Sequence, residues 1–318
     1  MNNATNPEIW LTHNGHFHCD DVFAYAALKM AFKGNDHILV RTRDKEKIAN
    51  AKIVFDVGGI ADEHSNRFDH HQQGAPRRED GTSYSSAGLI WKKYGERAVS
   101  ADLAESCKEG TEMVTTIAKM IDERIVKMID LIDNGEDQPS DKRYNSIGLA
   151  QIVNDFNPTW DMPPYGENND YEDHCFKKAV DFVYEFLSNK INQYRAKILA
   201  ENHVLAAYQN GIDDRILIMD RSMPWNSTAF KHGFNTLFAV YPAQKNGQWM
   251  VDTMPIEPGS YSQKKPLPAE WAGLVDNELA TVSGIPDAVF VHLKRFCGAA
   301  KSKEGAIAMA RKALATTD

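Results

Sequence analysis

Potential metal ligands occur in three short clusters within the first 71 residues. Histidines and aspartates lie at 13–21, an aspartate stands alone at 56, and an Asp-His-His sequence occupies 69–71. The intervals are long enough for each cluster to lie at the end of a different strand of one α/β sheet. Open parallel sheets bind ligands at the carboxyl ends of their strands. We therefore expect the chain to fold so that imidazole and carboxylate groups converge at one sheet edge.

The N-terminal half alternates short apolar strands with helices. Strands are predicted at 9–11, 38–40 and 53–55. Helices are predicted at 22–31 and 87–94. Asp20 or Asp21 is placed to cap the first of these helices. This alternation favours an α/β fold with a mostly parallel, doubly wound sheet.

A further amphipathic helix is predicted between Met113 and Ile132. The apolar positions at helical spacing are 114, 117, 118, 121, 125, 128, 129 and 132. Asp130 and Asp133 lie in the last turn, where the helix dipole disfavours each carboxylate by roughly 0.3 to 1 kcal/mol. A nearby cation that compensates them is one interpretation. The other is the ordinary polarity of an acidic helix end.

A stretch at 155–173 is rich in proline and acidic residues and lacks periodicity, which predicts a domain boundary. We expect a metal-binding catalytic domain at 1–155, a linker loop and helical connector at 156–210, and a smaller α+β substrate-binding domain at 211–318. Within the connector, a helix is predicted at 175–208. The last domain has strand-like segments at 216–219, 236–241 and 249–254, and a final helix at about 303–314.

The composition is that of a globular protein. Hydrophobic residues make up 42% of the chain, and no apolar run approaches the roughly 20 residues that span a bilayer. No targeting segment is recognised, so a cytoplasmic location is expected. The net charge of −8 excludes a globally basic nucleic-acid-binding protein but not local positive patches. The four cysteines are far apart, which argues against disulfides and a thiolate zinc site, and Cys19 is not expected to be a ligand.

Clustered imidazoles and carboxylates suit manganese, zinc, iron or cobalt, whereas an all-oxygen cage would suit magnesium or calcium. Two divalent ions about 3.5 to 4 Å apart can share one carboxylate, activate a bridging water and clamp a phosphoryl group. Asp56, between the two histidine clusters, is the expected bridge, and His70 is an expected ligand. His71 is free to meet the substrate phosphate or the leaving group. Asp69 is expected to orient an imidazole.

Some of these residues have simpler interpretations. A single histidine on a strand is more often a hydrogen-bonded core residue, and this interpretation is retained for His16 and His64. Ser85 and Ser86 precede a helix. They are predicted either to cap it or, where its N-terminus faces the site, to bind substrate phosphate.

Longer motifs resemble those of the melanocyte proliferating gene (Myg) family. They include Thr12-His13-Asn14-Gly15-x-Phe17-His18-Cys19-Asp20, Asp56-Val57-Gly58-Gly59, Phe68-Asp69-His70-His71-Gln72, Ser85-Ser86-Ala87-Gly88-Leu89 and Ile132-Asp133-Asn134-Gly135. That family is related to the DHH phosphoesterases, which include RecJ-type nucleases and manganese inorganic pyrophosphatases. Its eukaryotic members are described as 3′ to 5′ RNA exonucleases. The resemblance implies a DHH-like N-terminal domain, a smaller C-terminal domain and an active site in the cleft between them.

The resemblance also implies particular ligands. They are His13, His18, Asp20, Asp56, His70 and either Asp133 or Asp130, with His71 beside them. The first motif departs from the superfamily form, because His18 replaces an aspartate and its spacing from His13 is one residue longer. An imidazole there makes the site softer, so zinc and iron are plausible beside the expected two manganese ions. Magnesium also stays open.

The strongest positive bias in this acidic chain lies at 294–312. In the DHH superfamily the C-terminal domain holds the substrate, so Arg295, Lys301 and Lys303 are predicted to bind substrate phosphate. The alternative is a solvated helix face.

The leading hypothesis is a metal-dependent phosphoesterase that acts by two-metal activation of water, as a 3′ to 5′ exonuclease on single-stranded RNA or short oligonucleotides. One alternative is a hydrolase of another bond, because His16-Phe17-His18 also resembles the His-x-His of amidohydrolases. Another is a non-catalytic metal- and nucleic-acid-binding protein. Oligomeric state, the choice of RNA or DNA, and the identity and number of the metal ions stay open.

Overall fold

The computed structural model describes residues 7–104, 110–136, 148–162 and 170–317. The chain forms two compact units, Met1–Arg195 and Ala196–Asp318. Their boundary falls within the segment 156–210, for which the sequence predicted a connector. Part of that predicted linker loop, 163–169, lies outside the described residues, as does Cys107. No helix in the described part of the chain is long and apolar enough to cross a membrane.

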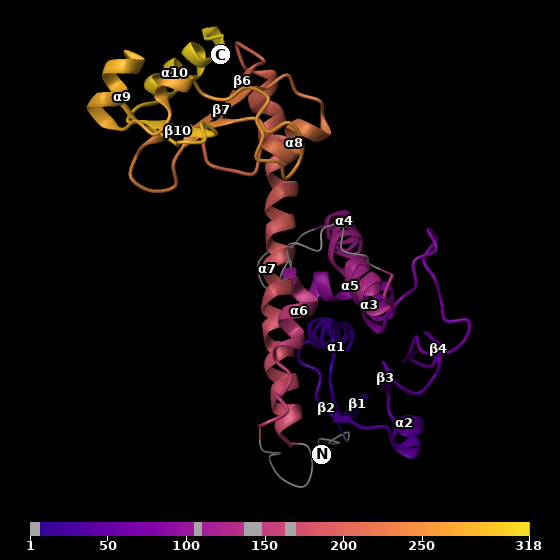
Figure 1. The fold of residues 1–318 in the computed structure, drawn as a ribbon. Coiled ribbons are helices and arrows are strands. Elements are labelled where there is room, and N and C mark those ends of the chain that lie inside the picture. Colours follow the sequence, from indigo (N-terminus) through magenta and orange to yellow (C-terminus); the bar gives the residue numbers. More distant parts are fainter. Residues whose placement is uncertain (1–6, 105–109, 137–147, 163–169, 318) are drawn as a thin grey trace, which may run out of the picture. The chain divides into compact units, whose positions relative to one another are not determined.

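Unit 1 contains a five-stranded sheet (Figure 1). Its strands are β1 (Glu8–Thr12), β2 (His37–Arg41), β3 (Ile53–Phe55), β4 (Ala61–Asp62) and β5 (Arg67–Phe68). The order is β2-β1-β3-β5-β4, in which β2, β1, β3 and β5 are parallel and β4 is an antiparallel edge strand. The prediction of a mixed α/β fold is confirmed, and the sheet of unit 1 is mostly parallel.

The strand order changes direction between β1 and β3. The chain passes from β1 to β2 on one side and then returns across β1 to β3 on the other. Such a reversal leaves a crevice at the carboxyl ends of the two strands, because the connections leave them in opposite directions. The fold therefore offers a ligand site where β1 and β3 end.

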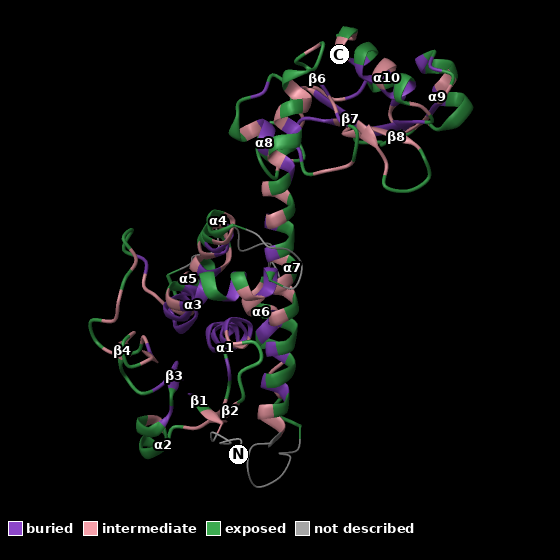
Figure 2. Cartoon of the chain, turned by 180° about the vertical axis from the view of Figure 1, so that it is seen from behind, coloured by how far each residue is buried: buried purple, intermediate pink, exposed green. Residues whose placement is uncertain are grey.

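The helices of unit 1 pack around α1. They are α1 (Cys19–Ala31), α2 (Lys45–Asn50), α3 (Ser86–Leu103), α4 (Thr111–Ile121), a π-helical turn (Asp122–Val126), α5 (Lys127–Asp133), α6 (Leu149–Asn154) and the first part of α7 (Asp170–Gln209). Nearly every residue of α1 is buried, as Figure 2 shows, because α1 contacts α3, α5 and α6. A capping box between His18 and Asp21 begins α1.

The π-helical turn was not predicted. The sequence predicted one continuous helix from Met113 to Ile132, but the buried series steps five residues from Ile121 to Val126 instead of three or four. One extra residue in a turn rotates everything beyond it by about 100° relative to a regular helix. The side chains that follow the turn therefore face directions that helical spacing alone does not give.

Unit 2 is a second five-stranded sheet with helices. Its elements are the end of α7, β6 (Ile216–Ile218), α8 (Asn226–Lys231), β7 (Phe238–Pro242), β8 (Trp249–Thr253), a 3-10 turn (Ala269–Trp271), α9 (Asp276–Ser283), β9 (Ala288–Val291), β10 (Cys297–Ala300) and α10 (Lys303–Ala315). The order is β6-β7-β8-β10-β9, with only β6 and β7 parallel. Its core is apolar and includes Phe238, Val251, Trp271 and Met309.

Candidate metal centre

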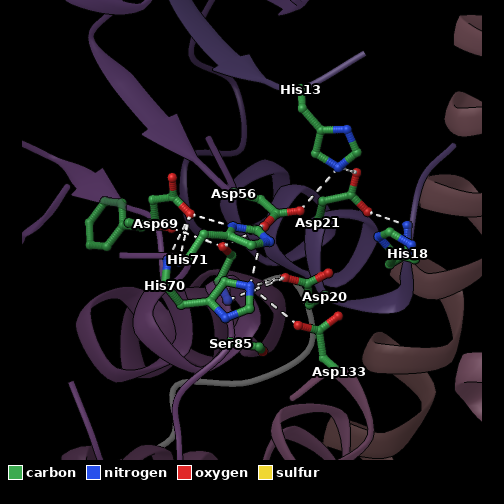
Figure 3. A network of polar contacts seen from close by, with 12 residues as sticks. His13, His18, Asp20, Asp21, Asp56, Asp69, His70, His71, Ser85 and Asp133 are labelled. Atoms are coloured by element: carbon green, nitrogen blue, oxygen red, sulfur yellow. Dashed lines mark hydrogen bonds and ion pairs between the residues drawn. The ribbon is translucent and has the colours of Figure 1, made fainter. Parts of the chain in front are cut away.

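Three adjacent strands of unit 1 end beside one another, and each is followed by a residue of the predicted site. His13 follows β1, Asp56 follows β3, and Asp69 follows β5. Figure 3 shows these side chains pointing toward one another, with Asp133 from the end of α5 on the opposite side. They line a cavity of about 1520 Å³. The sheet edge thus gathers the three sequence clusters, as the spacing predicted.

Asp56 lies at the centre of the cluster. Its Oδ2 is 3.1 Å from His13 Nε2, and its Oδ1 is 3.4 Å from His70 Nε2 and 3.6 Å from His71 Nδ1. Its backbone is in the left-handed region, at φ 55°, which aspartate tolerates better than most residues but which still costs free energy. Burial opposes its ionisation, but the neighbouring imidazoles of His13 and His70 lower the pKa of Asp56 well below its usual range.

The hydrogen bonds of His70 define which ring nitrogen carries the proton. The amide of Asn134 donates to the carbonyl oxygens of Ser83 and Asp130, so its Oδ1 is left to accept from His70 Nδ1 at 3.3 Å. In the neutral ring, Nε2 then carries a lone pair. This nitrogen faces carboxylate oxygens of Asp20, Asp56 and Asp133 at 3.6, 3.4 and 3.2 Å, and it has no hydrogen-bond partner.

His13 and His71 are held in the same way. His13 Nδ1 is 3.0 Å from the carbonyl oxygen of Asn14, which leaves Nε2 facing Asp56 and, at 3.4 Å, Asp21. His71 Nδ1 is 2.7 Å from Asp69 Oδ1, and 64% of the His71 side chain is exposed. The two histidines differ in consequence. His13 is buried and points at carboxylates, whereas His71 presents its Nε2 edge outward.

Asp69 is an acceptor for several groups. It accepts hydrogen bonds from the backbone of Gly59, His70 and His71 and from the ring of His71. Although burial opposes ionisation, the bonds from His71 and Gly59 lower the pKa of Asp69. The bond to Asp69 in turn raises the pKa of His71. The structure therefore couples Asp69 to His71, which was the orientation predicted for it.

Three further carboxylates crowd the centre. Burial, reinforced by neighbouring carboxylates, raises the pKa of Asp20 well above its usual range, that of Asp21 to about 7 and that of Asp133 above normal. Asp20 Oδ1 and Asp21 Oδ2 are buried without a hydrogen-bond partner. Despite burial, the proximity of Asp56 and other negative charge raises the pKa of both His13 and His70. The shifts of the carboxyl groups follow from burial and from the close approach of several carboxylates.

The donor atoms are close enough to coordinate ions. Four groups have ligand atoms within 4.8 Å of one another: His13, His18 and Asp56; Asp56, His70 and His71; His18, Asp20 and Asp133; and Asp20, Asp21 and Asp56. Asp56 belongs to three of the groups, as a shared carboxylate would. The unpartnered oxygens and the Nε2 lone pair of His70 are the atoms that a divalent ion would bind. The residues present therefore fit metal ions.

Asp130, the alternative to Asp133, has different partners. It is completely buried, accepts hydrogen bonds from the backbone and hydroxyl of Ser85, and forms a 2.7 Å ion pair with Arg78. It belongs to none of the four groups, which were sought among the described residues. Asp133, not Asp130, is the carboxylate of α5 that reaches the centre. A cation that compensates the carboxylates at this helix end was one interpretation of the sequence. For Asp130 this cation is Arg78, whereas the neighbour of Asp133 is the His70 ring.

The structure does not support substrate binding by Ser85 and Ser86. Both are completely buried. Ser85 donates its hydroxyl to Asp130, and Ser86 donates to the carbonyl oxygen of Phe68 and approaches Asp56 Oδ1 at 3.3 Å. Neither hydroxyl is open to a substrate, so both serve to hold carboxylates in place.

The remaining histidine assignments are mixed. His16 belongs to none of the ligand groups and is exposed, with Nε2 3.0 Å from Asn154 Oδ1. His64 is exposed on a turn, so the core interpretation was wrong for both histidines. Cys19 is buried and lies outside the ligand groups.

Sequence reasoning missed three residues that support the centre. Asn134 sets the tautomer of His70, and Asp21 adds a carboxylate beside His13. Arg41, with 1% of its side chain exposed, donates to the carbonyl oxygen of Gly15 at 2.6 Å and to Asp173 at 2.9 Å. Arg41 thus anchors the loop that carries His13 and His18. Asp21 alone had a signal, because it lies three residues after His18 in a capping box.

The predicted phosphate-binding residues Arg295, Lys301 and Lys303 belong to unit 2. Arg295 donates to the carbonyl oxygen of Leu267 and has a left-handed backbone at φ 60°. Lys301 is exposed, and the Lys303 ammonium lies 5.5 Å from the centre of the Trp249 ring. All the residues that line the cavity of the metal centre come from unit 1.

The fold and the site together define an α/β protein with a histidine–aspartate centre suited to divalent ions at the carboxyl edge of its N-terminal sheet. A family model named for the MYG1 exonuclease, described as uncharacterised protein family UPF0160, matches residues 9–314. The chain belongs to this family, which confirms the resemblance found in the sequence.

Its relatives match along most of their length. A MYG1 exonuclease of Homo sapiens is 35% identical over 96% of this chain and 85% of its own length. A MYG1 protein of Caenorhabditis elegans is 34% identical over 95% of this chain and 94% of its own. One solved structure, an uncharacterized protein from Helicobacter pylori G27, aligns with 11% identity and a TM-score of 0.19, which carries no information on the fold.

Proposed function

We propose that the chain is a metal-dependent phosphodiesterase, acting as a 3′ to 5′ exonuclease on RNA or short oligonucleotides. The observation that carries the proposal is the Nε2 lone pair of His70, which is buried without a partner and faces three carboxylates. Such an arrangement is repulsive unless protons or metal ions lie among these atoms, and several close donor groups of this kind favour a metal ion. Relatives named exonuclease support the choice of a phosphodiester as substrate.

The proposed ligands are the residues of the four groups other than His71, which is assigned to the substrate. They are His13, His18, Asp20, Asp56, His70 and Asp133, with Asp21 as an additional carboxylate. Mixed imidazole and carboxylate donors suit manganese, with zinc or iron as alternatives. When bound, two such ions supply positive charge that lowers the pKa of water and neutralises the phosphoryl oxygens. The proposed arrangement is that of a DHH-like phosphoesterase domain.

His71 is the proposed proton donor to the leaving oxygen. Its Nδ1 is fixed by Asp69, its other ring edge is exposed, and the bond to Asp69 raises its pKa, so the imidazolium persists to higher pH. A positioned histidine of this kind contributes roughly 10² to 10⁴ to a rate. Lys301 and Lys303 in unit 2 remain proposed contacts for substrate phosphates.

The test is turnover by metal-stripped protein. End-labelled RNA, DNA and pyrophosphate are incubated with the stripped protein after manganese, magnesium or zinc has been added back. We expect stepwise shortening of RNA from its 3′ end that requires metal and is absent in an Asp56→Asn variant. No phosphoester turnover with any metal would overturn the proposal.

A further inference from the structure

A row of apolar side chains faces the same cavity as the metal centre. The row consists of Ile125, Met128 and Ile132 and is called the apolar strip. Met128 and Ile132 are 42% and 43% exposed. They lie one helical turn apart on α5, so they share a face. Exposed apolar surface beside polar groups is typical of a ligand-binding surface.

The π-helical turn places the strip in the cavity. Helical spacing from Ile117 and Ile121 predicts that positions 125, 128 and 132 continue the core face. Because of the extra residue, Val126 and Ile129 take the buried positions, and the more exposed side chains of the strip face the cavity, which Ile129 also borders. The same rotation brings Asp133 to the metal centre. This one backbone irregularity therefore determines the orientation of both the apolar strip and Asp133. π-helical insertions are frequent at functional sites.

Other apolar groups extend this wall. Leu149 and Ala150 from α6 and Phe186 from the unit 1 part of α7 line the cavity with the strip. The cavity, at about 1520 Å³, is larger than the roughly 300 to 1,000 Å³ that encloses a drug-sized ligand. It therefore has room for a ligand with an anionic part at the metal centre and an apolar part beside it.

The charged groups at the two ends of the apolar strip indicate which class of ligand the strip could bind. Ile132 adjoins Asp133 of the metal centre, whereas Ile125 adjoins Arg124, whose exposed guanidinium also lines the cavity. Arg43 is a second exposed cation in the lining. An apolar surface between the proposed phosphate-binding centre and a guanidinium suits a nucleotide whose neighbouring phosphates reach the two charged ends while its base projects from the sugar onto the apolar surface.

We infer that the apolar strip binds a nucleobase of the substrate, next to the phosphodiester at the metal centre. The inference rests on the proposed function, since it assigns the position of a base relative to that phosphodiester. Ile125, Met128 and Ile132 carry no hydrogen-bonding side-chain groups, so they contact a base through its face and do not distinguish one base from another. The strip thereby favours single-stranded substrates, whose bases are free to leave a stack.

The experiment compares two RNA oligonucleotides that differ only in whether the 3′-terminal nucleotide carries a base. Met128→Gln and Ile132→Asn are measured against Ile38→Asn, a control on β2 that is 50% exposed and lies outside the cavity lining. For the intact substrate, each strip variant is expected to raise KM about fivefold, which corresponds to about 1 kcal/mol. KM for the abasic substrate and the behaviour of the control should not change. Equal effects on both substrates, or no effect on either, would overturn the inference.

A binding measurement separates this inference from the proposed function. The fluorescence of a 5′-phosphorylated 2-aminopurine ribonucleotide is followed on addition of manganese-loaded protein. Quenching that weakens in the strip variants supports the strip even where no substrate is cleaved, a result that would overturn only the exonuclease activity. The Met128→Phe variant offers an aromatic ring on which the base can stack, so it should bind the probe more tightly. If the variants change only thermal stability and bind the probe like the unaltered protein, the strip is a structural surface and the inference fails.

Discussion

The interiors of the two units differ in what they bury. Unit 1 buries ionisable side chains at or near its sheet edge, namely His13, Asp20, Asp21, Asp56, Asp69 and Asp130. Among the described residues of unit 2, the buried polar side chains are Thr228, Thr236, Thr253 and Ser283, all uncharged. Buried charges cost several kcal/mol each unless they are paired, whereas hydroxyls need only one hydrogen bond. Unit 2 is therefore built as a conventional core, and unit 1 contains a group of residues that we propose to bind cations.

The same contrast recurs within one helix. Asp130 and Asp133 are three residues apart on α5, yet Asp130 is bound by Arg78 and Ser85, and Asp133 lies among carboxylates and His70. Asp130 is a fully satisfied structural carboxylate. Asp133 is not, and this difference favours Asp133 as the proposed metal ligand.

The largest expected effect comes from removing the shared carboxylate of unit 1. Mutation of a residue that only supports a metal ligand typically lowers metal affinity or activity roughly 10- to 100-fold. Since Asp56 occurs in three of the four ligand groups, Asp56→Asn should reduce metal-dependent RNA hydrolysis by more than about a thousandfold. Asp252→Asn in unit 2, where Tyr241 still donates to the new side chain, serves as the matched control. Comparable losses in both variants would remove the distinction between the units.

The next effect concerns stability. Arg78→Met leaves Asp130 buried without its cation and should lower the free energy of unfolding by about 3 to 5 kcal/mol. Arg215→Met in unit 2 breaks an exposed pair with Asp213 and should change it by at most about 1 kcal/mol. Urea unfolding of both variants tests this. Similar small changes would show that Asp130 does not depend on Arg78.

A smaller effect is expected from the exposed histidine. His71→Gln should reduce kcat about a hundredfold while metal affinity changes little, since His71 is proposed to move a proton. Asp69→Asn removes the negative charge of the group whose bond raises the pKa of His71, and a neutral amide oxygen stabilises the imidazolium less. The high-pH limb of the rate profile should therefore move to lower pH in this variant. A loss of rate with an unshifted profile would limit Asp69 to a structural role.

The smallest expected effect is a change in melting temperature with pH. The pKa of Asp21 rises to about 7 on folding, and that of Asp20 is also raised. A carboxyl group with a raised pKa contributes stability that is present below about pH 3.9 and is lost as pH rises through its folded value. The raised pKa values of His13 and His70 act in the same direction above about pH 6.5. Metal-stripped protein should thus melt a few degrees lower at pH 8 than at pH 5, and manganese should remove the difference.

The sequence predicted the convergence of the site better than its details. Clusters that directly follow apolar strands had to meet at one edge of a parallel sheet, and His13, Asp56 and His70 do so. The sequence could not decide between Asp130 and Asp133, because the extra residue of the π-helical turn cannot be recognised in the apolar periodicity.

Tertiary contacts account for the other differences. Ser85 and Ser86 look like free caps in the sequence, but Asp130 and Asp56, distant along the chain, take their hydroxyls. The strands β4 and β5 are two residues long each, too short for any pattern to predict. Arg78 had no sequence signal, and Asn134 appeared only as part of a family motif, because the roles of both follow from what the fold brings next to them.

The central claim, that the histidine–aspartate centre of unit 1 requires cations, is tested most directly by calorimetric titration of metal-stripped protein with manganese. We expect saturable binding with release of protons, because His70 and carboxyl groups with raised pKa values lose protons when ions bind. The binding should be lost in Asp56→Asn and retained in Asp252→Asn. An absence of binding, or equal binding by Asp56→Asn, would contradict the account.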